Sequence, residues 1–324
     1  MGEFELIDII RTRCVHARND VALGIGDDAA LLDAPAGRQL AVCTDTLVAG
    51  VHFPRDTAPD DIGWKSLAVN LSDLAAMGAE PAWAQLALTL PDADGGFVER
   101  FAGGFAELAN AHGVALVGGD VTQGPLTVTV TALGLVPRGM ALTRSGARLG
   151  DAVFVTGTLG DAAGALELLR HREAGTGDRP DAFPALLARL NRPAPRLAAG
   201  LALRGIASAC IDVSDGLLAD LGRLCNASGV GAEIAADALP VSPQLASSCD
   251  AGTCRMLALS GGDDYELCFT APATRTVEID ALLADAGCAA TRIGRIVTGA
   301  SVHVQDARGN PIDTPRAGWE HFPR

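Results

Sequence analysis

The chain has 324 residues and a formal net charge of −14 at pH 7, and 48% of its residues are hydrophobic while only 4% are aromatic. This length predicts about two domains of roughly 150 residues each, with cores built from aliphatic side chains. The acidic balance argues against a basic face that binds nucleic acid, and no apolar run reaches the roughly 20 residues that span a bilayer.

The first residues and the cysteines both indicate a cytoplasmic protein. The opening MGEFELIDIIRTR carries acids where a signal peptide would carry Lys or Arg, so nothing in it directs export. The eight cysteines form no C-x-x-C pair, and several stand in apolar runs such as SACIDV and YELCFT. We therefore expect reduced thiols that act as small hydrophobic side chains, rather than a disulfide or zinc framework.

Hydrophobic periodicity and turn residues predict a mixed α/β chain. In the N-terminal part we expect a helix at 3–13, strands at 38–44 and 46–52, a helix at 58–78, a strand at 81–91, a helix at 96–112, and strands at 113–117 and 125–136. The helix at 58–78 has the clearest ends, because Pro59 suits a first helical turn and Gly78 suits the position just after a helix.

A domain boundary is expected near 137–149, which gives an N-terminal domain of residues 1–138 and a C-terminal domain of residues 139–324. In the second domain the pattern predicts strands at 151–157, 206–212, 265–270 and 291–297, and helices at 159–171, 181–190, 194–204, 215–228 and 275–286. The stretch REAGTGDRPD, at 172–181, is predicted to be a mobile surface loop.

Several familiar nucleotide-binding and catalytic motifs are missing. Lys65 is the only lysine and stands in GWKSLA, which excludes a Walker-type phosphate loop. GIGDDA lacks the third glycine of the dinucleotide fingerprint, the EF-hand pattern is absent, and Ser214 does not stand in a G-x-S-x-G elbow. Any phosphate chemistry must therefore depend on other side chains.

Carboxylates recur in one local setting, beside glycine at the end of an apolar run. The residues in this setting are Asp27, Asp28, Asp45, Asp120, Asp212, Asp215, Asp263 and Asp264. Any one of them could simply make a turn, as Asp and Gly commonly do. As a set they predict function, since loops at strand ends present side chains on a rigid scaffold.

Asp73 stands on a helix that is apolar on almost every side, and such a helix is normally buried. It follows Asn70 by three residues, so the two side chains share one surface of the helix. A buried carboxylate is neutralised, paired or bound to a metal. Asp73 could therefore bind a metal ion. It could also have a structural role, such as capping a helix or pairing with Lys65 or an arginine.

The electrostatics of these acids favour a cation between the protein and its ligand. Two like charges about 4 Å apart repel by roughly 4 kcal/mol at an effective dielectric of 20, so the acids alone would repel a nucleotide triphosphate. Mg²⁺ is commonly held by a few carboxylates together with substrate phosphates and waters. The sequence therefore predicts Mg²⁺ ions that bridge the aspartates to phosphate.

Two further residues are candidates for the same site. His52, in LVAGVHF, follows the Asp45 segment and is the one histidine that we place near the acids. Arg144, in ALTRSGA, could bind phosphate through its fork geometry, although a lone arginine is more often an ordinary surface residue.

Seven segments resemble those of the thiamine-monophosphate kinases and follow one another in the same order: LGIGDDAALL, TDTLVAGVHF, KSLAVNLSDLAAMGAEPAWAQLALTLP, VGGDVTQGPLTVTVTALG, ALTRSGARLGDAVFVTGTLGDAAGAL, IDVSDGLLADLG and LSGGDDYELCFT. The resemblance covers essentially the whole chain. It implies the two-domain PurM-like fold of the aminoimidazole-ribonucleotide synthetase superfamily, with β-strands of the N-terminal domain forming a homodimer interface. It also implies Mg²⁺-dependent phosphate transfer from ATP to thiamine phosphate, giving thiamine diphosphate and ADP.

The resemblance also implies a role for each residue at a matching position. The metal ions would lie among Asp28, Cys43, Thr44, Asp45, Asp73, Asp120, Asp212 and Asp215. ATP would contact Gly119, Asp120, Arg144 and Ser214, and thiamine phosphate would lie against His52, Asp263 and Trp319. Two positions depart from the family pattern, because Cys43 stands where Ser is frequent and Asp263 stands where Glu is frequent.

The implied reaction needs no general base, because the attacking phosphate oxygen is already anionic. We therefore expect direct phosphoryl transfer without a covalent enzyme intermediate, in which positioning and metal ions supply most of the rate. Two alternatives remain: another ATP-using member of the superfamily, such as a selenophosphate or amidine-forming synthetase, or a non-catalytic sensor of thiamine phosphates or Mg²⁺-nucleotide. The full-length resemblance disfavours the first, and the complete set of aspartates disfavours the second.

Overall fold

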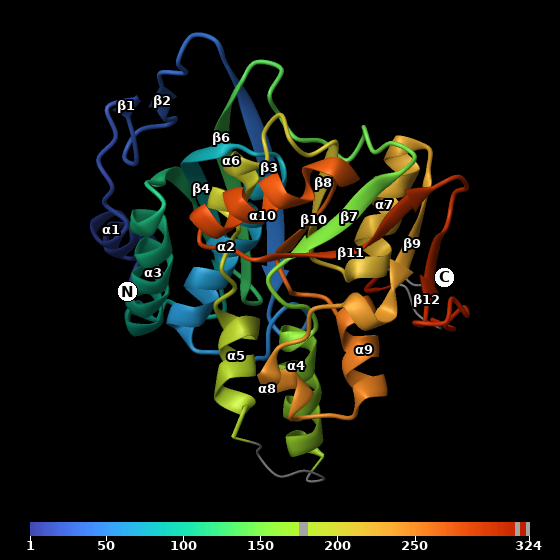
Figure 1. Ribbon diagram of the computed structural model, residues 1–324. Helices are drawn as coiled ribbons and strands as arrows, with labels where there is room; N and C mark the ends of the chain where they lie inside the picture. The colour runs from blue at the N-terminus through green and yellow to red at the C-terminus, as the bar shows by residue number, and fades with distance from the viewer. Residues whose placement is uncertain (175–180, 315–317, 322–324) are drawn as a thin grey trace. The chain divides into compact units, whose positions relative to one another are not determined.

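The computed structural model describes residues 1–174, 181–314 and 318–321. The chain separates into two compact units (Figure 1), an N-terminal unit of residues 1–74 and 79–139 and a C-terminal unit of residues 75–78 and 140–324. Helices and strands are mixed in both units, so the predicted mixed α/β class is confirmed. Most of the loop expected at 172–181 lies outside the described residues.

The N-terminal unit is built on a four-stranded sheet in the order β3-β6-β4-β5. The strands are β3 (Arg38–Val48), β4 (Glu80–Leu90), β5 (Ala115–Gln123) and β6 (Thr127–Pro137). β6 pairs antiparallel with β3 and with β4, and β5 runs parallel to β4. The two strands expected at 38–44 and 46–52 form one strand, because every residue of β3 pairs with β6 and no turn interrupts the ladder.

The helices of this unit are α1 (Glu3–Arg13), α2 (Pro59–Ala76) and α3 (Gly95–Ala111), and a short hairpin joins β1 (Val21–Leu23) to β2 (Leu31–Leu32). α2 packs on one face of the sheet, where the Cys43 sulfur on β3 lies 3.4 Å from the Asn70 carbonyl oxygen. The predicted burial of α2 is confirmed, since Leu67 and Leu71 are completely buried. The opposite face is more open, and Leu40 and Val42 of β3 are exposed there.

The C-terminal unit contains a six-stranded sheet in the order β12-β9-β11-β7-β10-β8. The strands are β7 (Asp151–Thr156), β8 (Ala209–Val213), β9 (Gly231–Ala235), β10 (Glu266–Pro272), β11 (Ala290–Val297) and β12 (Val302–Gln305). β12 runs parallel to β9, and the other neighbours pair antiparallel. The helices are α4 (Asp161–Glu173), α5 (Phe183–Asn191), α6 (Leu197–Ala202), α7 (Leu217–Ser228), α8 (Pro243–Ala246), α9 (Ala251–Ser260) and α10 (Thr276–Asp285).

Aliphatic side chains form the main core of this unit, as the composition predicts. One cluster fills the space between the sheet and α7, with Val153, Ile211, Leu221 and Ile293 at most 1% exposed. A second cluster lies among α4, α5, α8 and α9, around Leu186 and Leu245. Burial of aliphatic surface on this scale is the main force that stabilises the unit.

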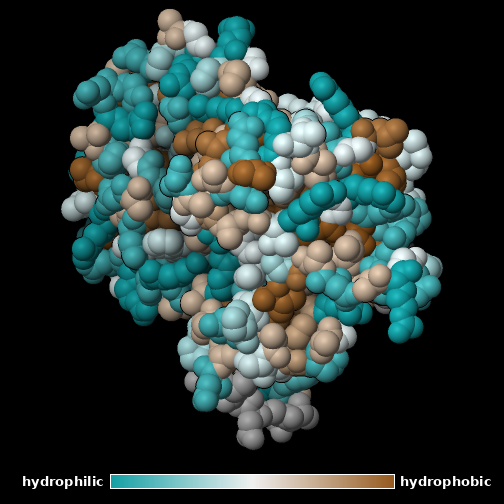
Figure 2. Space-filling model, viewed as in Figure 1, coloured by the Kyte–Doolittle hydropathy of each residue, from teal (hydrophilic) through white to brown (hydrophobic). Residues whose placement is uncertain are grey.

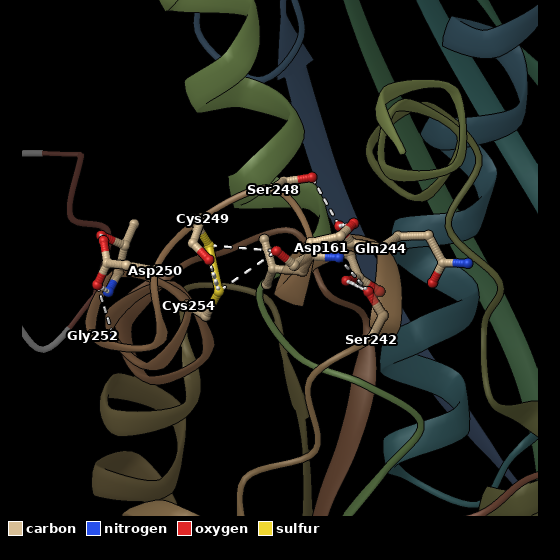
Figure 3. Close-up of a disulfide and its surroundings, with 11 residues drawn as sticks. Asp161, Ser242, Gln244, Ser248, Cys249, Asp250, Gly252 and Cys254 are labelled. Carbon is tan, nitrogen blue, oxygen red and sulfur yellow. Dashed lines mark hydrogen bonds between the residues drawn. A yellow bond between two sulfur atoms is a disulfide. The ribbon is translucent and has the colours of Figure 1, made fainter. Parts of the chain in front are cut away.

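One pair of cysteines contradicts the expectation of reduced thiols. Cys249 and Cys254 form a disulfide at the start of α9 (Figure 3). Asp250 caps this helix, because its carboxylate accepts hydrogen bonds from the Gly252 and Thr253 amides. The tight turn that results brings the two Cα atoms to 6.0 Å, which is within the usual range for a disulfide. The other six cysteines are free thiols, and five of them are buried.

Within the described ranges, no helix is both long and apolar enough to cross a membrane. On the face shown in Figure 2, hydrophobic residues lie in small patches between hydrophilic ones. Scattered apolar residues of this kind are normal on a protein surface.

Candidate functional site

The N-terminal unit contains a pocket of about 810 Å³. Its walls come from α1, from the segment 25–30 and from the open face of the sheet. The predicted residues Asp28, Gly119 and Asp120 all line it, together with Asp27 and Gln85. The structure therefore brings two sequence motifs, GIGDDAA and VGGD, to one cavity.

The pairing register explains which side chains of the sheet face this pocket. Asp120 on β5 pairs with Ala87 on β4, which pairs with Thr129 on β6, and paired residues point to the same side of a sheet. Thr44 reaches the same side, where its hydroxyl lies 2.9 Å from the hydroxyl of Thr131, a pocket residue. Thr44 is thus at the edge of the pocket through its side chain.

Gly119 is required by the backbone geometry of the pocket wall. Its φ of +151° disfavours any side chain, and a Cβ there would lie 1.8 Å from the Leu86 carbonyl oxygen. We expect Gly119→Ala to lower the free energy of unfolding by about 3 kcal/mol and to distort the pocket. Gly118→Ala is the matched control, because a Cβ at that position meets nothing closer than 3.8 Å. Chemical denaturation of both variants measures this loss. A free energy of unfolding for Gly119→Ala equal to that of the wild type would contradict the prediction.

A second group of predicted residues lies under α2. Cys43 contacts Asn70, and burial, then the charges of Asp73 and Asp45, raise the pKa of the Cys43 thiol. Cys43 and Asp45 alternate with Thr44 along β3, so they point to the opposite side of the sheet. The predicted metal residues of the N-terminal unit therefore form two groups, one at the pocket and one beside α2.

His52 follows the end of β3, and its ring orientation is fixed. Its Nδ1 accepts a hydrogen bond from the Val48 amide at 2.9 Å, which leaves the proton of the neutral ring on Nε2. The His52 carbonyl oxygen accepts a hydrogen bond from Lys65, the only lysine, at 3.2 Å. Lys65 is 2% exposed, so it supports this loop from within.

In the C-terminal unit, three loops bring predicted residues side by side. The Asp263 amide donates to the Ser214 carbonyl oxygen at 2.8 Å, and the Trp319 amide donates to the Asp215 carbonyl oxygen at 3.0 Å. Asp212 lies at the end of β8, just before this loop, and is buried. Ser214, Asp215, Asp263 and Trp319 are therefore neighbours, although they come from three distant parts of the sequence.

Asp220, which the sequence analysis does not single out, holds the central loop in place. One oxygen of its carboxylate accepts the backbone N–H groups of Ser214, Asp215 and Gly216 at 3.0 to 3.2 Å. Burial raises the pKa of Asp220 to about 6, against the opposing charge of Arg223. Arg223 also lies 2.6 Å from the Asp215 carboxylate. The only sequence signal for this role is an acid in the first turn of a helix that follows a glycine turn.

Arg144 lies in the exposed loop before β7. Its carbonyl oxygen accepts a hydrogen bond from the Ser228 hydroxyl at the end of α7, which fixes the backbone of the loop. The guanidinium is exposed and able to reach a ligand. Its contact with phosphate stays a prediction.

The donor set of the pocket fits Mg²⁺. Asp28 and Asp120 offer carboxylate oxygens, which are the ligands that this hard ion prefers. Within the part of the chain that the structure describes, no group of three or more His, Cys, Asp or Glu side chains is arranged to hold a metal ion. Because Mg²⁺ commonly takes one or two carboxylates together with substrate phosphates and waters, the pocket fits an ion that arrives with a nucleotide.

Known proteins are similar to this chain over almost its full length. The family model for the N-terminal domain of AIR synthase related proteins matches residues 26–136, and the model for the C-terminal domain matches residues 148–307. A thiamine-monophosphate kinase of Escherichia coli K12 is 47% identical over 99% of this chain and 98% of its own length.

Two solved structures are similar as well. The thiamine-monophosphate kinase of Stenotrophomonas maltophilia has a TM-score of 0.86 and 52% identity, and the match covers 94% of this chain and 96% of that one. A structure described as AaThiL complexed with AMPPCP and TMP has a TM-score of 0.78 and 36% identity, with coverage of 99% and 97%.

Proposed function

The chain belongs to the thiamine-monophosphate kinase family, and we propose that it transfers the γ-phosphate of ATP directly to thiamine phosphate with the help of Mg²⁺. The observation that carries this proposal is the similarity, over 99% of the chain, to a relative described as complexed with AMPPCP and TMP. The alternative of a different superfamily synthetase has no comparable support, because full-length relatives at 47% identity are thiamine-monophosphate kinases.

The residues at the pocket suit the binding of Mg²⁺ and ATP. Asp28 and Asp120 would hold Mg²⁺ bound to the ATP phosphates, and Thr44 lies at the edge of the same pocket. Mg²⁺ supplies charge neutralisation when two anions meet. Cys43, Asp45 and Asp73 would contribute further metal ligands from the group beside α2, as the family resemblance implies.

The loops of the C-terminal unit carry residues that suit the binding of thiamine phosphate, ATP and metal ions. As the family resemblance implies, Ser214 would contact ATP and Asp212 and Asp215 would face metal ions. The residues that would contact thiamine phosphate are Asp263, Trp319 and His52. A phosphate oxygen of thiamine phosphate attacks the γ-phosphorus, the bond from that phosphorus to the β,γ-bridging oxygen breaks, and ADP leaves. Because the attacking oxygen is already anionic, no side chain has to remove a proton from it.

We also propose a homodimer formed through β3, the edge strand of the N-terminal sheet that lies at the opposite edge from the β5 wall of the pocket. Leu40 and Val42 are 49% and 59% exposed on adjacent outward positions of β3, and such a face is usually covered in an assembly. Light scattering on the purified protein should give twice the chain mass of 33.1 kDa.

We place the enzyme in the cytoplasm. Six of the eight cysteines are free thiols, which is typical of a reducing compartment. The Cys249–Cys254 disulfide is the exception, and thiol alkylation of protein taken directly from cells would show its state there.

The direct test is an assay of the purified protein with ATP, Mg²⁺ and thiamine phosphate. Thiamine diphosphate and ADP should form in equal amounts, and chelation of Mg²⁺ should stop the reaction. Incubation with γ-labelled ATP alone should leave the protein unlabelled, since the transfer is direct. Binding of both ligands without product would favour the sensor, and a labelled protein that passes its phosphate to thiamine phosphate would contradict direct transfer.

A further inference from the structure

The loop that carries Asp263 has an unusual backbone. Among the described residues, Asp263 with φ +67° and Tyr265 with φ +51° are the only non-glycine residues in the left-handed region. Side chains rarely adopt this conformation because Cβ crowds the backbone, and strain of this kind is commonly kept at functional sites. Two such residues in one turn indicate a loop that is held in a particular shape.

Neighbouring elements hold this loop on both sides of Asp264. The Asp263 amide donates to the Ser214 carbonyl oxygen and the Tyr265 amide donates to the Val213 carbonyl oxygen, each at 2.8 Å. The Asp264 carboxylate is 2% exposed and accepts the Gly160 amide at 2.9 Å. The backbone of the loop is therefore anchored to β8 and to the turn before α4.

The side chains of the two strained residues meet. The Tyr265 hydroxyl donates a hydrogen bond of 2.8 Å to the Asp263 Oδ1 atom. Tyr265 is 7% exposed, so its ring is fixed by packing, whereas Asp263 is only partly buried and can be reached by a ligand. A rigid phenol thus sets the direction of a more accessible carboxylate, through a hydrogen bond of ordinary length.

We propose that Tyr265 is a positioning residue that orients the Asp263 carboxylate toward thiamine phosphate. This inference rests on the proposed function, in which Asp263 contacts that substrate. Thiamine phosphate carries a permanently cationic thiazolium ring and an aminopyrimidine, and both groups are attracted to a fixed carboxylate. The left-handed backbone at both positions brings the phenol and the carboxylate together, which gives the strain a functional reason.

The kinetic test compares Tyr265→Phe, Asp263→Asn and the double variant. Tyr265→Phe keeps the ring and loses only the hydroxyl, so the KM for thiamine phosphate should rise about tenfold while kcat and the KM for ATP stay within about twofold. Because the tyrosine acts through the carboxylate, the double variant should have the same KM for thiamine phosphate as Asp263→Asn alone. Additive effects, or an unchanged KM for thiamine phosphate, would overturn the proposal. A fall in kcat and in the thermal midpoint together would show that the tyrosine is merely structural.

A second test does not depend on turnover or on the Tyr265 variant. Tyr265 is the only tyrosine in the chain, so protein labelled with [ζ-¹³C]tyrosine gives a single NMR signal from the carbon that bears the hydroxyl. Asp263→Asn should shift this signal in the free protein, and thiamine phosphate without ATP should shift it in the wild type. If Asp263→Asn leaves the signal in place, the positioning role is wrong. If the wild type binds or converts no thiamine phosphate at all, the proposed function fails instead.

Discussion

Asparagine in place of Asp120 should lower the rate of phosphoryl transfer by about a thousandfold while the protein stays folded. Asp120 lines the pocket with Asp28, and its side chain is exposed on the sheet. An asparagine has the same shape but no charge, so it binds Mg²⁺ weakly. The repulsion between the phosphates of ATP and thiamine phosphate is then not neutralised. A thousandfold loss corresponds to about 4 kcal/mol of transition-state stabilisation, which is a common contribution of a metal-binding carboxylate.

The matched control is Asp92→Asn, which removes an exposed carboxylate of the same unit from an ordinary turn outside the pocket. This variant should keep the wild-type rate, because Asp92 lies outside the pocket proposed for ATP and Mg²⁺. Initial rates over a range of Mg²⁺ concentrations separate weaker metal binding from slower transfer, and circular dichroism verifies folding. Near wild-type turnover by Asp120→Asn would show that this carboxylate holds no essential metal.

The long elements of the fold could be predicted because their signals are local. α2 has Pro59 at its start, acids in its first turn and Gly78 after its end, and each of these acts within a few residues. β9 and β12 have five and four residues, which is too short for a periodic pattern to stand out from a loop. Their pairing with each other brings together residues about 70 positions apart, and no local pattern contains that information.

The candidate site could be predicted as a set of residues but not as an arrangement. Asp28 and Asp120 are predicted because they stand beside glycine, and the structure places both at one pocket. Thr44 and Asp45 face opposite sides of the sheet because side chains alternate along a strand, but which of the two faces the pocket depends on how β3 pairs in the sheet, and no local pattern contains that information. The role of Asp220 depends on a loop that folds back over the start of α7, so its position in the sequence does not reveal it.

The largest expected effect on stability comes from Glu266→Gln in the C-terminal unit. Glu266 is completely buried at the start of β10, where its carboxylate accepts hydrogen bonds from Arg189 at 2.7 Å, Arg196 at 2.6 Å and Thr156 at 2.7 Å. Burial alone would lower the pKa of the Arg196 guanidinium, and its contact with Glu266 more than reverses this effect. Removing the negative charge takes the shared counter-charge away from two largely buried arginines, and Arg189 keeps a longer contact, at 3.8 Å, with the Asp161 carboxylate. Breaking a buried pair in this way costs about 3–5 kcal/mol.

An exposed pair on the same sheet provides the control for this prediction. Glu233 on β9 binds Arg295 on β11 at 2.6 Å, with the arginine side chain 63% exposed. Glu233→Gln should lower the free energy of unfolding by less than about 1 kcal/mol, because water screens the lost attraction. Urea unfolding of both variants, with the wild type beside them, compares the two losses directly. Equal losses would mean that Glu266 contributes no more than a surface ion pair, and that packing alone joins α5 and the segment before α6 to the sheet.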